Sequence, residues 1–101
     1  MIIYSVTVKI DLDVHDDWLQ WMKNEHIPEV LATGKFKNHR ILRLLADDEQ
    51  DGINYNIQYS AESMSDYFDY QHNFATELQE KHTKRYKDKF VAFRTLLKEV
   101  E

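Results

Sequence analysis

An acid and a base stand side by side at the one place where a proline interrupts the first helical pattern. Glu25 and His26 precede Pro28, the single proline of the sequence. Because a histidine titrates near neutral pH, His26 could act as a general acid or base, with Glu25 or Glu29 orienting its ring. The alternative is structural: a protonated His26 would cap the carbonyls that a broken helix end leaves unpaired.

Aromatic side chains could complete a pocket around this pair. Three tyrosines alternate along two predicted strands on the side that should face the helices, and two more large side chains share the inner side of the first helix. A buried tyrosine hydroxyl needs a partner, and it can donate to an oxyanion that develops on a substrate. The alternative is that the hydroxyls reach solvent at the rim. The expected binding residues are Tyr4, Trp18, Met22, Tyr55 and Tyr59.

The elements that must position these residues follow from the apolar periodicity. Strict alternation of apolar and polar residues is typical of half-buried strands, whereas a spacing of three to four residues is typical of helices. Ser63 and Asp66 form an N-terminal capping signature. Strands are predicted over residues 2–10, 36–46, 53–60 and 88–100, an acidic loop over residues 47–52, and helices over residues 14–34 and 63–86.

The first of these helices cannot be straight. Trp18 and Met22 lie on one side of its helical wheel, whereas Val30 projects to nearly the opposite side. Both groups cannot face the sheet on one regular helix. Pro28 lacks a backbone donor and clashes with the preceding turn, so we predict that the helix kinks or restarts there.

The order strand, helix, strand, strand, helix, strand is the ferredoxin-like arrangement. It predicts one α+β domain over residues 1–101, in which a four-stranded antiparallel sheet carries two helices on one face. Small polar and amide side chains occupy the other face of the two central strands, which suits a partly covered surface. RNA would need aromatic platforms there, and these strands offer none. We therefore predict a homodimer that pairs through this face. The dimer-face residues are Ser5, Thr7, Asn54, Asn56 and Gln58.

Composition argues against several other classes of protein. The absence of cysteine excludes disulfides and thiolate sites, and a net charge of −5 disfavours nucleic acid. No apolar stretch approaches the roughly 20 residues that span a bilayer. Asp69 and His72 have a carboxylate-to-histidine spacing that is common by chance, so no metal site is expected. We expect a cytoplasmic protein without metal, cofactor, membrane or nucleic-acid partner.

A few polar residues allow two interpretations. His15 and His39 lie near element ends and are expected to be solvated, whereas His82 should edge the core. Arg43 and Arg94 lie inside predicted strands. They could serve the interior of a barrel or a contact between subunits, or they could simply be partly exposed.

Three stretches of the sequence resemble a bacterial family known as domain of unknown function 4286. They are WLQWMKNEHIPEVLATGKF (residues 18–36), YNIQYSAES (residues 55–63) and DKFVAFRTLLK (residues 88–98). The resemblance implies a ferredoxin-like subunit that pairs as a dimeric α+β barrel, with no assigned activity and no assigned catalytic residues. The wider superfamily includes cofactor-independent monooxygenases, isomerases and haem enzymes, so the fold alone says little about chemistry.

Two hypotheses for the function follow. The first is a homodimeric module that binds a small apolar or aromatic molecule or an interaction partner. The second is a monooxygenase- or isomerase-like enzyme without a cofactor, in which His26 is the general acid or base in a pocket between sheet and helices. Glu25 is the second catalytic candidate.

Overall fold

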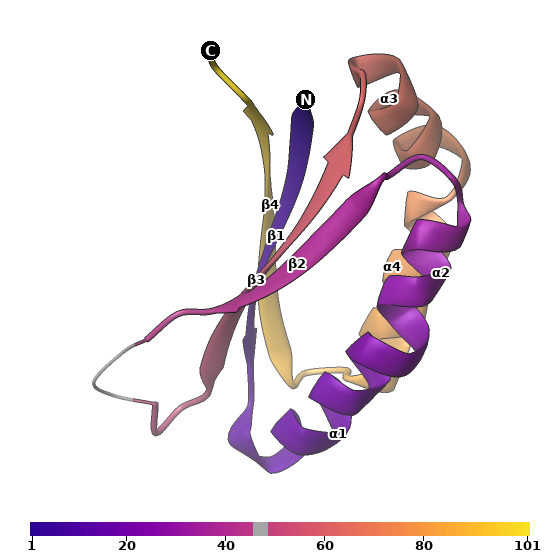
Figure 1. Ribbon diagram of the computed structural model, residues 1–101. Helices are drawn as coiled ribbons and strands as arrows, with labels where there is room; N and C mark the ends of the chain where they lie inside the picture. The colour runs from indigo at the N-terminus through magenta and orange to yellow at the C-terminus, as the bar shows by residue number, and fades with distance from the viewer. Residues whose placement is uncertain (46–48) are drawn as a thin grey trace.

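The computed structural model describes residues 1–45 and 49–101, and within them one antiparallel sheet carries helices on a single face (Figure 1). The sheet has the order β2-β3-β1-β4, which confirms the predicted ferredoxin-like α+β fold. None of the described helices is both long and apolar enough to cross a membrane. The strands are β1 (Ile2–Ile10), β2 (Asn38–Arg43), β3 (Ile53–Ala61) and β4 (Phe90–Lys98); the helical segments are η1 (Leu12–Val14), α1 (His15–Trp21), η2 (Met22–His26), α2 (Ile27–Ala32), α3 (Met64–Asn73) and α4 (Ala75–Arg85).

The strand register decides which side chains meet the helices. Tyr4 on β1 lies opposite Tyr59 on β3, and Val6 lies opposite Arg94 on β4. Directly paired residues project to the same face of a sheet. Apart from Ile3, the isoleucine, valine and tyrosine positions of the two central strands therefore share the helix-facing side, as the sequence predicts. The buried residues on this side are Ile2, Tyr4, Val8, Ile10, Ile53, Tyr55, Ile57, Tyr59 and Ala61.

A π-helical turn, rather than a kink at the proline, redirects the first helix. The backbone N–H of Ile27 donates to the carbonyl of Met22, so η2 contains one residue more than an α-helical turn. One additional residue shifts the side-chain direction by about 100°. Trp18 before the turn and Val30 after it are both buried in the core as a result. Pro28 lies in the first turn of α2, where a missing N–H costs little. The prediction that the helix breaks at Pro28 is therefore wrong, because the irregular turn is η2, just before the proline.

The helix predicted over residues 63–86 is in fact two helices. Phe74 has φ −130° and ψ −32°, outside the helical region, and it separates α3 from α4. The predicted cap is present, because the side chain of Ser63 accepts a hydrogen bond from the N–H of Asp66. The interruption lets Tyr70 of α3 and His82 of α4 both point into the core.

The second strand is shorter than predicted. It begins at Asn38, because Phe36 leaves the sheet and packs its ring 4.8 Å from that of Tyr70 and 5.3 Å from that of Tyr59. The predicted end of this strand at residue 46 and the start of the acidic loop at residues 47–48 lie outside the described residues.

Candidate functional site

A cavity lies between the helix-facing side of the sheet and the helices. It measures about 40 Å³ as the space open to the centre of a water molecule. Strands β1, β3 and β4 form its floor, η2 and α2 form one wall, and α3 and α4 contribute the cover. Valine, isoleucine, alanine and phenylalanine side chains make most of the floor apolar. The polar lining consists of Tyr4, Tyr59, Tyr70, His26, His82 and Gln79, with Arg94 from β4.

His26 lines this cavity from the last position of η2. Its Nδ1 is buried and has no hydrogen-bond partner among the described residues. The imidazole stacks on Trp21 with ring centroids 4.9 Å apart, and it meets the edge of His82 at 5.8 Å. The extra residue of the π-helical turn sets the direction in which this ring points.

Burial makes His26 a neutral imidazole at pH 7. Desolvation lowers the pKa of His26 to about 4; Glu29 raises it only in part, while Lys81 and Arg94 lower it further. A neutral ring whose Nδ1 has no partner in the described part of the chain does not fit the alternative in which a protonated His26 caps helix carbonyls. A neutral ring can instead donate from one nitrogen and accept at the other.

His82 lines the cavity, although the sequence placed it only at the edge of the core. The indole N–H of Trp18 donates to its Nε2 over 2.9 Å. Burial lowers the pKa of His82 to about 4, and the neighbouring His26 and Arg94 act in the same direction. Because an indole can only donate, Nε2 is the acceptor and the proton of the neutral ring lies on Nδ1. Trp18, a predicted binding residue, lies behind His82 and does not line the cavity.

Three tyrosines gather at the other end of the cavity. The ring of Tyr4 lies 6.0 Å from that of Tyr59 and 5.7 Å from that of Tyr70. Burial raises the pKa of all three hydroxyls; for Tyr4, the charge of Arg94 opposes this effect. These groups are therefore neutral hydrogen-bond donors at pH 7. Tyr70 was not predicted, because its position depends on the break at Phe74.

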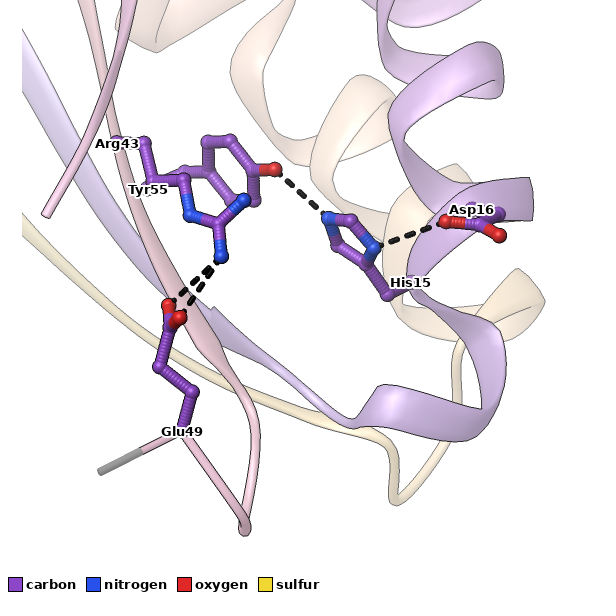
Figure 2. Close-up of polar contacts among 5 residues, drawn as sticks. All are labelled: His15, Asp16, Arg43, Glu49 and Tyr55. Carbon is purple, nitrogen blue, oxygen red and sulfur yellow. Dashed lines mark hydrogen bonds and ion pairs between the residues drawn. The ribbon is translucent and has the colours of Figure 1, made fainter. Parts of the chain in front are cut away.

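Tyr55 belongs to a different cluster, shown in Figure 2. Its hydroxyl lies 2.7 Å from Nε2 of His15, whose Nδ1 lies 3.1 Å from a carboxylate oxygen of Asp16. A carboxylate only accepts, so Nδ1 of His15 donates and Nε2 accepts from Tyr55. Figure 2 also shows Arg43, whose guanidinium donates to both carboxylate oxygens of Glu49 at 2.8 and 3.0 Å. Tyr55 thus does not line the cavity, and His15 is half-buried and partnered rather than solvated.

Neither predicted carboxylate reaches the cavity. Glu25 is exposed and lines a shallow hollow beside Asp17 and Arg85, so its expected inward position is wrong. Glu29 accepts a 2.8 Å hydrogen bond from Lys81 across α2 and α4. Of the predicted site residues, the structure brings together His26, Tyr4, Tyr59 and Met22.

The opposite side of the sheet, called here the open face, carries all five predicted dimer-face residues. The amide nitrogen of Asn56 donates to the hydroxyls of Ser5 and Thr7 over 2.8 and 3.0 Å, and Ser5 is 5% exposed. The amide oxygen of Asn56 is buried without a partner in the described part of the chain. Exposed apolar side chains surround this polar centre: Leu42 on β2 and Val91, Phe93 and Leu97 on β4.

The described residues contain no group of three His, Asp or Glu side chains that could hold a metal ion. Two carboxylates on the helices form ion pairs: Glu29 with Lys81, and Asp69 with Lys35 at 3.2 Å.

Solved structures of several other proteins share this fold. A dimeric ferredoxin-like protein from an uncultured marine organism has a TM-score of 0.69 and 14% identity, covering 100% of this chain and 96% of that one. An EthD-family protein from Bacillus halodurans has a TM-score of 0.68 and 10% identity, covering 99% and 100%. A candidate antibiotic biosynthesis monooxygenase from Bacillus cereus has a TM-score of 0.60 and 12% identity, covering 99% and 95%. Identities this low establish similarity of fold and not of activity.

Sequence comparison gives the family. No curated protein matches the chain. The sequence model of the family described as Domain of unknown function (DUF4286) matches residues 1–100, nearly the whole chain. The stretches that suggested this resemblance therefore extend into a match over all strands and helices, and the chain belongs to the DUF4286 family.

Proposed function

We propose that the protein is a homodimeric small-molecule-binding protein whose ligand occupies the cavity between the sheet and the helices. The observation that carries this proposal is the convergence of two neutral histidines and three tyrosines on one apolar cavity. Convergent polar groups with displaced pKa values in an apolar setting are typical of a ligand site. The free space of about 40 Å³ is smaller than most such sites, so a ligand must displace lining side chains to enter. The unpartnered Nδ1 of His26 would cost about 1–3 kcal/mol as it stands, and a ligand that bonds to it would remove that cost.

The chain offers an internal control for testing this. It contains three methionines, of which Met22 lines the cavity while Met1 and Met64 are exposed elsewhere. With ¹³C-labelled methionine methyl groups, a screen of small aromatic and aliphatic fragments should shift the Met22 signal and leave the other two unchanged. A screen in which no fragment moves Met22 alone would contradict the proposal.

The open face supports the homodimer. A buried amide oxygen without a partner and a ring of exposed apolar residues both suit a surface that a second copy covers. One structural neighbour is a dimeric ferredoxin-like protein, which is consistent with this assembly. The cytoplasm is the proposed location, since a cysteine-free chain needs no oxidising compartment.

A second candidate function is a reaction without a cofactor in the same cavity. Its motivation is that His26 is neutral and has an unpartnered ring nitrogen. As a general base, His26 would take a proton from an acidic C–H of the ligand, and Tyr4 and His82 would donate hydrogen bonds to the resulting oxyanion. With acetophenone in deuterated water, the wild type should then accelerate exchange of the methyl protons and His26→Ala should not. Equal exchange rates would exclude this chemistry for that class of ligand.

A further inference from the structure

The charge on the cavity lining is of one sign, which is positive. Arg94 is its one charged residue among the described residues, and no aspartate or glutamate joins it there. Two other arginines have carboxylate partners, Arg43 with Glu49 and Arg85 with Asp17. Arg40 instead donates to the amide oxygen of Gln58 on the open face. Arg94 forms no ion pair within the described part of the chain. An exposed guanidinium thus lies at the cavity without a counter-charge from its own protein.

The position of Arg94 follows from the sheet register. It lies opposite Val6 and two residues from Leu96, which lies opposite Tyr4, so its side chain projects to the helix-facing side. Its positive charge lowers the pKa of Tyr4 and Tyr70, and also those of His26 and His82. The field of one guanidinium therefore reaches both ends of the cavity.

The neutral polar groups add donors to this charge. The hydroxyls of Tyr4 and Tyr70 can donate, as can the amide of Gln79. Nε2 of His82 accepts from Trp18, so its Nδ1 carries a proton that it can donate. A guanidinium offers only donors. Such a lining has more hydrogen-bond donors than acceptors, and it suits an oxygen that carries negative charge.

We propose that the ligand is an organic monoanion, a carboxylate or a phenolate, whose charged oxygen lies against Arg94 and Tyr4 and whose apolar body points toward Met22. This inference rests on the proposed function and names the chemical class of its ligand. The exposed side of Arg94 places the charged end at the mouth, where a carboxylate keeps part of its hydration. The apolar floor of valine and isoleucine side chains then accepts the rest of the molecule.

Benzoate and benzamide provide a matched pair of probes, since they have nearly the same shape and differ in charge. Binding is measured as the shift of the ¹³C-methyl signal of Met22 at millimolar ligand. We expect benzoate to bind the wild type about tenfold more tightly than benzamide, because a hydrogen bond to a charged group is stronger than one between neutral groups. Arg94→Gln should remove this preference. Arg94→Lys should keep part of it, because it retains the charge and loses the planar fork.

Lys98→Gln is the control variant. Lys98 lies on the same strand and the same face, it is exposed, and it does not line the cavity. The Lys98→Gln variant should keep the preference for benzoate. This result would show that the preference depends on the contact with Arg94 and not on the net charge of the protein. Equal affinity of benzoate and benzamide for the wild type would overturn the inference and leave the proposed function standing. If neither compound and no fragment of the screen shifts Met22, both fail.

Discussion

The indole N–H of Trp18 donates a 2.9 Å hydrogen bond to Nε2 of His82, and this bond fixes the tautomer of a buried histidine that lines the cavity. The two residues are 64 positions apart in the sequence, on α1 and α4. Since Trp18 can only donate, it selects the tautomer of His82 that carries its proton on Nδ1. Trp18 therefore acts on the site as a positioning residue.

Trp18→Phe should remove the preference of His82 for the tautomer that carries its proton on Nδ1. It leaves Nε2 of His82 without its donor, and we expect the free energy of unfolding to fall by about 1–3 kcal/mol beyond the lost packing. Imidazole ¹⁵N chemical shifts should show that the proton of His82 is no longer confined to Nδ1. Trp21→Phe is the matched control, because Trp21 packs against the same ring at 5.7 Å without bonding to it. An unchanged ¹⁵N pattern in Trp18→Phe would contradict the assignment.

The two neutral histidines predict a loss of stability in mild acid. The pKa of His26 and of His82 is about 4 in the folded chain, against an ordinary value of 6.5. Between these values the unfolded chain binds more protons, so stability falls as the pH decreases from about 6.5 to about 4. Lowering the pH from 7 to 5 should cost up to about 2 kcal/mol for each histidine, as measured by urea unfolding.

Exposed histidines provide the control for this pH dependence. His39 and His72 are exposed, so His39→Gln and His72→Gln should leave the slope of stability against pH unchanged. His26→Gln and His82→Gln should each reduce it. The groups that act on His26 are Glu29, Lys81 and Arg94, and those that act on His82 are His26 and Arg94. If the free energy of unfolding of the wild type is the same at pH 7 and pH 5, burial does not lower the pKa of these two imidazoles.

The proposed homodimer can be tested with a pair of phenylalanines. Phe93 on the open face is 62% exposed, and Phe68 on α3 is 58% exposed on the helical layer. Light scattering should give about twice the 12.2 kDa chain mass for the wild type and for Phe68→Glu. Phe93→Glu should give a monomer, because a buried unpaired carboxylate is costly. A wild-type monomer, or a dimer that both variants retain, would move the interface away from the open face.

The fold could be predicted because residues of the two faces alternate along the sequences of β1 and β3. A period of two assigns each residue of β1 and β3 to one of the two faces of the sheet. Burial alternates strictly along β3, whereas on β1 the open-face residue Ser5 is also buried and Val6 is only partly buried. The helical breaks could not be predicted in the same way. The additional residue of η2 and the break at Phe74 involve no glycine, and Pro28 lies just after the π-helical turn. Because these breaks set the direction of each helix, the sequence misplaces Glu25 and misses Tyr70 as a lining residue.

Distance along a strand explains the misplaced tyrosine. Tyr55 and Tyr59 share one face of β3, and four residues of strand separate them by about 13 Å. Alternation predicts the face but not which helix covers each end. At one end α1 brings His15 to Tyr55, and at the other α3 brings Tyr70 beside Tyr59 and Tyr4.

The two ends of the sheet should therefore respond differently to the loss of one hydroxyl. Tyr4→Phe removes a donor from the cavity, and we expect it to weaken benzoate binding by about three- to tenfold, measured by titration of the Met22 methyl signal. Tyr55→Phe leaves Nε2 of His15 without its donor, so the free energy of unfolding should fall by about 1 kcal/mol. Its affinity for benzoate should match that of the wild type. If Tyr55→Phe weakens binding as much as Tyr4→Phe does, the ligand reaches beyond the cavity toward α1, and the assignment of the site to the Tyr4 end of the sheet is wrong.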